Sequence, residues 1–227
     1  LIPLLDQFSR EKIENLKIVY CAEKLKSKSR YLRRRENHQS LHILGCSFDQ
    51  VTYLNDYFLV DDLELHLSSK LIYHFLVRFV NVNKIKQILT LNFEGGHPDH
   101  DSLALLVEKI SRELDIFPFY FPAYNARRQT LIPLSLFKPI RSQEYLFSSI
   151  TYRSFCWLKL FSLPFIYLSE YKAFLKLFPF FIPQVLFSRE LLYSTTIDML
   201  SVRWGKTLSW NIYKVSIQSI IKEIDSI

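Results

Sequence analysis

Short apolar runs alternate with amphipathic stretches along the first 130 residues of the chain. Buried strands are predicted at 16–22, 49–54, 86–91 and 117–121, because each run is apolar, short and bounded by polar or turn-forming residues. Helices are predicted at 33–44, 63–81 and 102–114 from apolar positions three and four residues apart. Gly45 gives the expected stop signal for the first of these helices. Strands that alternate with helices form mostly parallel sheets, so the pattern predicts an α/β fold.

The character of the chain changes after about residue 130. Residues 145–187 hold fourteen aromatic side chains, interrupted by charged residues such as Arg153 and Lys159. The longest uncharged run, 177–188, is about half of the ~20 residues that span a bilayer. Two interpretations remain open: helices that pack over the sheet, or an apolar face that lies on a membrane surface. We therefore expect an α/β domain at 1–130 and a helical, aromatic-rich region at 131–227 that packs on the same domain.

The net charge indicates which kinds of partner the protein could bind, and the cysteines indicate the redox state of its compartment. The formal net charge is +7, and seven positive charges lie within the twelve residues from Lys24 to Arg35. This cluster is either a solvated loop and helix start or a contact for phosphate or acidic lipid. A nucleic-acid partner is disfavoured, because the cluster lies in one loop without a recognised binding motif. Cys21, Cys46 and Cys156 are far apart and set in apolar surroundings, which predicts buried thiols in a reducing compartment.

The most specific candidate for chemistry follows the predicted strand at 86–91. Residues 94–101 read Glu-Gly-Gly-His-Pro-Asp-His-Asp, with His97 and His100 three residues apart. In open parallel sheets, sites form beyond the carboxyl ends of the strands. One imidazole could bind a divalent metal while the other polarises a carbonyl or moves a proton. The alternative is a polar turn that caps the next helix, with Asp99 or Asp101 near its start.

Four segments together resemble the PIG-L/LmbE family of sugar N-deacetylases. His97-Pro98-Asp99-His100 after two glycines is similar to the second signature of the family. Arg33-x-x-Glu36, on a helix that runs to a Leu-Gly pair, resembles its Arg-x-x-Glu helix. The strand at 18–23 ends in an acidic residue, as the second strand of the family does, and 53–56 resembles the loop with a substrate-facing Asp. The order and spacing agree over about residues 1–125.

The resemblance implies a Rossmann-like fold and a zinc-dependent hydrolase that removes an N-acetyl group from an N-acetylglucosamine-type sugar or glycoconjugate. It makes His100 a metal ligand. His97 and Asp99 would be the catalytic residues, with His97 stabilising the oxyanion. The metal would be zinc or another divalent ion.

On the substrate side, the resemblance implies that Arg33 contacts the sugar or its carrier and that Asp56 contacts a sugar hydroxyl. Glu23 is a further candidate for the substrate pocket. The expected partner is an amino-sugar glycoconjugate, together with an anionic carrier or a membrane surface. The expected location is the cytoplasm, with peripheral contact to a membrane. The oligomeric state is not predicted.

The chain departs from the family in one respect. The first signature of the family, His-Pro-Asp-Asp-Glu, supplies two zinc ligands and the general base, and it does not occur in residues 1–227. We expect it to precede Leu1. A single His ligand would hold zinc weakly or not at all, so we expect this chain by itself to be inactive. The alternative function is a catalytically inactive protein on the same scaffold that binds a glycolipid or a membrane surface.

Two further groups are predicted to be structural. His38, His42, His66 and His74 follow helical positions and are expected on the surface or in the core. Asp61-Asp62-x-Glu64 is expected to form the acidic first turn of a helix rather than a metal cluster.

Overall fold

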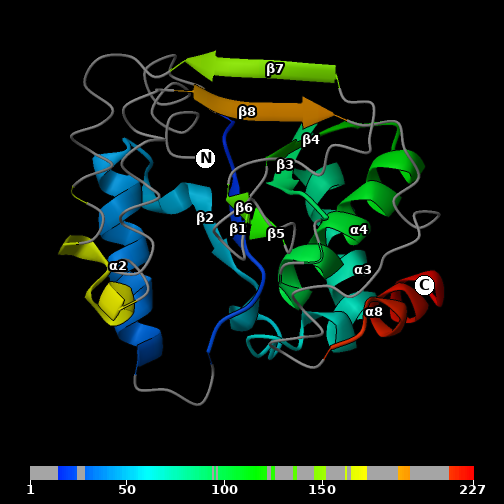
Figure 1. Ribbon diagram of the computed structural model, residues 1–227, viewed down its shortest axis with the longest axis horizontal. Coiled ribbons are helices and arrows are strands. Elements are labelled where there is room, and N and C mark those ends of the chain that lie inside the picture. The colour runs from blue at the N-terminus through cyan, green and yellow to red at the C-terminus, as the bar shows by residue number, and fades with distance from the viewer. Residues whose placement is uncertain are drawn as a thin grey trace. The chain divides into compact units, whose positions relative to one another are not determined.

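A computed structural model gives the fold (Figure 1). It describes residues 15–24, 29–93, 95, 97–121, 124–125, 135–136, 146–151, 162, 165–172, 189–194 and 215–227. The strands are β1 (Ile18–Tyr20), β2 (Val51–Tyr53), β3 (Gln87–Leu91), β4 (Phe117–Phe121), β5 (Tyr124–Asn125), β6 (Ser135–Leu136), β7 (Leu146–Thr151) and β8 (Arg189–Ser194). The helices are α2 (Ser29–Ile43), α3 (Ser69–Val82), α4 (Pro98–Glu113) and α8 (Ile217–Asp225), with 3-10 turns η1 (Phe48–Gln50), η2 (Leu54–Asp56), η3 (Leu65–Ser68) and η4 (Leu168–Glu170).

The prediction of an α/β fold is confirmed. All four predicted strands and all three predicted helices are present, with ends shifted by a few residues. Contacts group the chain into two compact units: unit 1 is Leu1–Leu59 with Ser149–Glu190, and unit 2 is Val60–Ser148 with Leu191–Ile227. The predicted division at residue 130 is a different description of the chain and stays a prediction. None of the helices in the described ranges is long and apolar enough to cross a bilayer.

Unit 1 is built on the parallel strand pair β1–β2. Ile18 pairs with Val51, and the register runs on to Tyr20 and Tyr53. Helix α2 covers the pair. A small core joins them, formed by buried Leu41, Leu44 and Cys46 with Leu16, Ile18, Tyr20 and Val51 packed against it.

The end of α2 confirms the prediction made from Gly45. Gly45 adopts φ 84°, its N–H bonds the His42 carbonyl at 2.9 Å, and the Cys46 N–H bonds the Leu41 carbonyl at 2.9 Å. This is a Schellman cap, in which a left-handed residue lets the chain reverse while the last carbonyls stay bonded. The cap returns Cys46 to the core beside Leu41. Cys21 and Cys46 are buried, as predicted, and Cys156 lies outside the described residues.

Unit 2 contains a mixed sheet. β3 and β4 are parallel, in register from Gln87 opposite Phe117 to Leu91 opposite Phe121. β8 then pairs antiparallel with β4 at Tyr193 and Tyr120, and the strand order is β3-β4-β8-β7. The strands β7 and β8 lie within the region predicted to be helical. One reason that a strand forms here instead of a helix is the edge of β4. Without β8, that edge would expose unpaired backbone groups.

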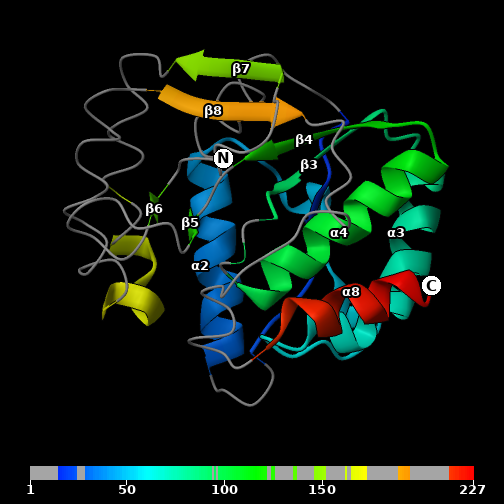
Figure 2. The same ribbon diagram turned by 45° about the vertical axis from the view of Figure 1, so that its right-hand side comes forward.

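Three helices pack together in unit 2 (Figures 1 and 2). α4 lies against β3 and β4, and it also contacts α3 and α8. The helix α8 is a short amphipathic element, with Ile217, Ile220 and Ile224 all buried. Its first turn is capped by the Ser216 hydroxyl, which accepts from the Ser219 N–H at 3.0 Å. The core of unit 2 therefore lies between the sheet and this helical layer.

Candidate functional site

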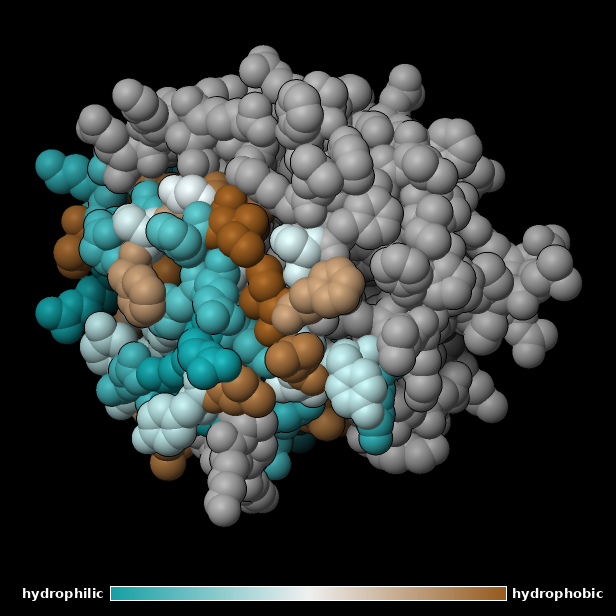
Figure 3. All heavy atoms as spheres, turned by 90° about the vertical axis from the view of Figure 1, so that its left-hand side faces the viewer, coloured by the Kyte–Doolittle hydropathy of each residue, from teal (hydrophilic) through white to brown (hydrophobic). Residues whose placement is uncertain are grey.

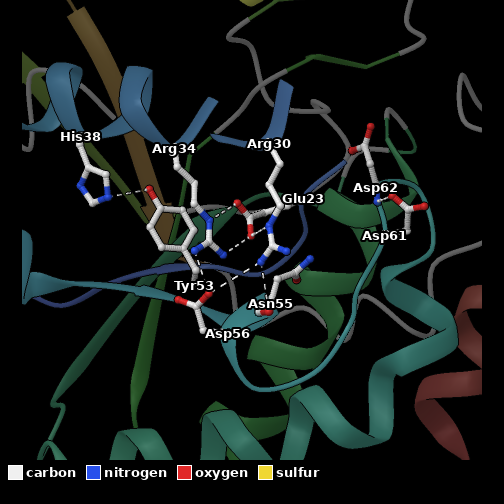
Figure 4. Close-up of polar contacts among 9 residues, drawn as sticks. All are labelled: Glu23, Arg30, Arg34, His38, Tyr53, Asn55, Asp56, Asp61 and Asp62. Carbon is white, nitrogen blue, oxygen red and sulfur yellow. Dashed lines mark hydrogen bonds and ion pairs between the residues drawn. The ribbon is translucent and has the colours of Figure 1, made fainter. Parts of the chain in front are cut away.

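Two clusters of polar side chains lie beyond the carboxyl ends of parallel strands, one in each unit. The first, called here the arginine cluster, consists of Glu23, Arg30, Arg34 and Asp56 in unit 1 (Figure 4). Glu23 follows β1, Asp56 lies in η2 directly after β2, and both arginines project from the first turns of α2. The loops that follow these two strands therefore converge within unit 1.

Arg34 is the centre of the arginine cluster. Its Nε and Nη2 donate to the two carboxylate oxygens of Glu23 at 2.7 and 2.5 Å. Its Nη1 lies 2.7 Å from Asp56 Oδ1. Arg30 adds contacts from Nε to Glu23 at 3.3 Å and from Nη2 to the Asn55 carbonyl at 3.2 Å. The bidentate contact between Arg34 and Glu23 fixes the orientation of the two side chains as well as the distance between them.

Aromatic rings support the same guanidinium. The Arg34 carbon Cζ lies 4.2 Å from the centre of the Tyr53 ring, and Tyr53 stacks on Tyr20 at 4.9 Å. The hydrogen bond to Glu23 is the main reason that the pKa of Arg34 is raised, and burial raises the pKa of Tyr53 to about 12. His38 stacks on Phe48 at 3.6 Å, and burial followed by the charge of Arg34 lowers its pKa.

The structure brings together two of the three residues predicted to bind substrate. Glu23 and Asp56 share Arg30 and Arg34, whereas Arg33 lies with its Cζ 5.7 Å from the ring centre of Tyr167. The side chain of Glu23 is only 6% exposed and that of Asp56 is 50% exposed. Asp56 therefore retains surface for a ligand, while Glu23 is occupied by the two arginines.

Sequence reasoning treated Arg30 and Arg34 only as part of a basic run. The signal for them was their spacing. Positions four apart on a helix share a face, and α2 turns that face toward the ends of β1 and β2.

The second cluster surrounds the start of α4, directly after β3 in unit 2. His97 is the N-cap, and its Nδ1 accepts from the Asp99 N–H at 3.3 Å. Pro98 takes the first helical position, where its missing N–H does not matter. Asp101 Oδ1 accepts from the Gly95 N–H at 3.0 Å. The capping interpretation of the His-Pro-Asp-His segment is confirmed.

Asp99 shapes the loop that precedes η3. Its two carboxylate oxygens accept from the Leu63 N–H at 2.8 Å and the Leu65 N–H at 3.1 Å. Leu63 has φ 73°, a left-handed conformation that is unfavourable for a branched apolar residue. Burial raises the pKa of Asp99 to about 6, although both backbone bonds oppose the shift. Asp99 therefore holds a strained turn in place, and that turn positions Asp62.

Asp62, His97 and Asp99 form a group, called here the aspartate–histidine trio, that could hold a metal ion. Each offers one ligand atom, and these atoms lie within 4.8 Å of one another. Two ligand atoms of a tetrahedral zinc ion are about 3.4 Å apart, so the three side chains would have to move closer together to hold the ion. Two carboxylates and one imidazole are a donor set that zinc accepts. The residues present therefore fit a divalent metal.

The predicted metal ligand is not in the trio, whose His97 and Asp99 were predicted to be catalytic residues. Asp62 was expected in a helical first turn, but it precedes η3 and faces His97 and Asp99. His100 was expected to be the ligand, and it lies outside the trio with its ring stacked on that of His97 at 4.6 Å. Burial lowers the pKa of His100 to about 3, and the charge of His97 adds to the shift. The imidazole of His100 is thus neutral near pH 7, the form that binds metals.

The chain resembles a solved structure, although its sequence matches no protein-family model and no curated protein sequence. The chain is similar to the crystal structure of the antimicrobial reagent A40926 pseudoaglycone deacetylase Dbv21, with a TM-score of 0.58 and 12% sequence identity. The match covers 89% of this chain and 92% of that one. At this identity the likeness shows that the two chains share a fold.

Proposed function

We propose that the protein is a metal-dependent hydrolase of the PIG-L/LmbE type, which removes an N-acetyl group from an N-acetylglucosamine-type sugar or glycoconjugate. The observation that carries the proposal is the aspartate–histidine trio at the end of β3. The fold shared with a deacetylase supports it. The His-Pro-Asp-His resemblance supports it independently from the sequence.

The trio also changes one expectation from the sequence. A single histidine ligand would not hold zinc, and catalytic zinc sites use three protein ligands and keep one open position. Asp62 and Asp99 bring two more donors to His97 within residues 1–227. A divalent ion, when bound, would supply a Lewis acid and lower the pKa of a bound water.

The protein's own side chains would bind the metal ion and the substrate and would stabilise the charge that develops in the reaction. Burial raises the pKa of Asp99 to about 6, and above that pH its carboxylate would be charged and able to hold a cation. His100 stays neutral and is able to donate one hydrogen bond from its ring to a developing oxyanion. Within unit 1, the half-exposed Asp56 has surface available for a ligand hydroxyl, and Arg33 carries a positive charge that would suit an anionic carrier. In this proposal Glu23 acts indirectly, because it orients Arg34 beside Asp56.

The experiment measures acetate released from N-acetylglucosaminyl conjugates, with Zn²⁺, Co²⁺, Mn²⁺ or EDTA added to the purified chain. We expect release that requires the metal and is lost in Asp62→Asn. The matched control is Asp61→Asn, a neighbouring carboxylate outside the trio, which should keep the activity. Acetate release that survives EDTA and Asp62→Asn would contradict the metal-dependent mechanism.

A second candidate is a catalytically inactive protein on the same scaffold that binds a glycolipid or a membrane surface. One observation favours it: His97 and Asp99 both have structural tasks, as a helix cap and as the anchor of the turn at Leu63. In the same assay this candidate predicts that the conjugate binds and that no acetate appears with any of the metals.

A further inference from the structure

The segment 165–172, called here the η4 segment, packs on α2 through polar groups. The Tyr167 hydroxyl bonds the Ser40 hydroxyl at 2.8 Å and donates to Asn37 Oδ1 at 3.1 Å. The Glu36 carboxylate accepts from the Ser169 N–H at 2.9 Å and from the Ser169 hydroxyl at 2.5 Å. Glu36, Asn37 and Ser40 are all buried. The inner side of the η4 segment is therefore its polar side.

The outer side of the same segment is apolar. Phe165, Leu168 and Tyr171 are 80%, 61% and 50% exposed. All three are large apolar side chains, and they are the most exposed of this type in the segment. An ordinary surface element has the reverse arrangement, with its apolar side inward. Polar bonds hold this segment to α2 while three large apolar side chains face outward.

Positive charge accompanies these apolar side chains. Lys172 is exposed, with Nζ 5.9 Å from the ring centre of Tyr171. On α2, Arg33 lies over Tyr167, and Tyr31 and Arg35 are exposed. The η4 segment, yellow in Figure 1, lies on the side that faces the viewer in Figure 3, where brown apolar and teal hydrophilic residues meet at the surface. Arg33, Arg35 and Lys172 are positive here, and Glu36 and Glu170 are negative, so the apolar side chains lie beside a small net positive charge.

We propose that the η4 segment and the adjoining part of α2 dock on the surface of an anionic lipid bilayer. Phe165, Leu168 and Tyr171 would enter the boundary between headgroups and acyl chains, where aromatic and apolar side chains are favoured. Lys172 and Arg35 would lie at the level of the anionic headgroups, which attract basic residues. The net positive charge beside exposed apolar side chains favours an anionic lipid surface over an uncharged apolar protein groove. This inference does not depend on the proposed hydrolase activity.

The test is co-sedimentation of the purified 227-residue chain with vesicles of phosphatidylcholine alone or of phosphatidylcholine with phosphatidylserine. We expect binding to the anionic vesicles that weakens as salt is raised. The triple variant Phe165→Ser, Leu168→Ser, Tyr171→Ser should reduce the partition coefficient by at least about tenfold. Circular dichroism would check that the triple variant is folded, which we expect because the substituted side chains are exposed.

A matched control uses apolar side chains exposed elsewhere. Leu67→Ser with Leu71→Ser changes two residues that are 64% and 58% exposed in unit 2, and it should leave vesicle binding unchanged. Equal binding by the triple variant and the native chain would overturn the proposal. So would the absence of vesicle binding together with a concentration-dependent dimer that the triple variant loses, because the occupant of the surface would then be a second copy of the chain.

Discussion

Arg34, in the first half of α2, donates two hydrogen bonds to the Glu23 carboxylate, at 2.7 and 2.5 Å, in the loop that follows β1. The same guanidinium reaches Asp56 after β2 at 2.7 Å. One side chain on the helix thus fastens the loops that follow both strands of the pair. The two carboxylates differ in environment, since Glu23 is buried and Asp56 is half exposed. They should therefore differ in their contribution to stability.

Glu23→Gln should lower the free energy of unfolding by about 2–3 kcal/mol. Removing one member of a buried ion pair costs about 3–5 kcal/mol, and partial exposure of Arg34 reduces that figure. Asp56→Asn should cost no more than about 1 kcal/mol, because exposed ion pairs contribute little. Urea unfolding of both variants measures the difference. Equal losses for the two variants would show that burial does not decide the strength of the cluster.

Glu36→Gln should loosen the η4 segment. The carboxylate of Glu36 is buried and accepts two hydrogen bonds from Ser169. In Gln the amide oxygen would accept from the Ser169 N–H and the NH₂ would donate to the Ser169 hydroxyl, so two charge-assisted bonds become weaker neutral ones. The expected loss is about 1–3 kcal/mol. Hydrogen exchange should rise at residues 165–172 before it rises in β3 and β4. The control is Gln39→Ala, an exposed position on the same helix, which should change neither measurement.

Three helices end in the same way, and only one of them ends with glycine. Lys84 after α3 and Asp115 after α4 have φ values of 51° and 50°, in the position that Gly45 takes after α2. Lys84→Gly and Asp115→Gly should each stabilise the fold by about 0.5–1 kcal/mol, because glycine adopts this conformation without the clash of a Cβ atom. Gly45→Ala should destabilise it by about 1 kcal/mol. Thermal unfolding of the three variants would show the opposite signs, and a loss of stability in Lys84→Gly would contradict the argument.

These helix ends explain how far the sequence predicts the fold. Gly45 marks its turn because glycine is the usual residue there, whereas Lys84 and Asp115 carry no local signal. Tertiary packing overrides their preference, since the residues that follow return to the core. Strands β1 to β4 were predictable because their apolar runs are short and uninterrupted. Strands β7 and β8 were not, because dense aromatic and aliphatic residues fit a buried helix as well as a strand.

The candidate sites also contain some residues that the sequence predicts and others that it does not. The His-Pro-Asp-His segment was identified from residue types at the end of a strand, and its capping role follows from its place before a helix. Asp62 could not be identified, because it reaches His97 through a left-handed Leu63 that two long-range bonds to Asp99 hold in place. Nothing in the local sequence specifies that turn.

His38 should make stability depend on pH. Burial and the charge of Arg34 lower its pKa in the folded chain, while in the unfolded chain it titrates near about 6.5. Between these two values the unfolded chain binds more protons, so the contribution of His38 is present above about pH 6.5 and is lost as the pH falls. His38→Phe keeps a ring to stack on Phe48 and removes the titration. The rise in unfolding free energy between about pH 5 and pH 7 should be smaller in this variant, and an unchanged slope would contradict the assignment.

The cap and the ligand roles of His97 compete for the same ring, and one substitution separates them. While Nδ1 accepts from the Asp99 N–H, the proton of a neutral ring lies on Nε2, which then cannot bind a metal. A metal-bound His97 therefore gives up its cap, whether the metal takes Nδ1 or the ring changes tautomer to free Nε2. His97→Asn supplies a good N-cap oxygen without an imidazole, so the free energy of unfolding without metal should stay within about 0.5 kcal/mol of the native value.

In the same variant, Zn²⁺ binding measured by calorimetry should be lost. His97→Ala should lose both the zinc affinity and about 1 kcal/mol of stability, because it removes the cap as well. Zinc binding that persists in His97→Asn and disappears in His100→Asn would move the ligand from the trio to His100, as the family resemblance implies. Because His97 and His100 stack on each other, only this pair of variants distinguishes which ring faces the metal.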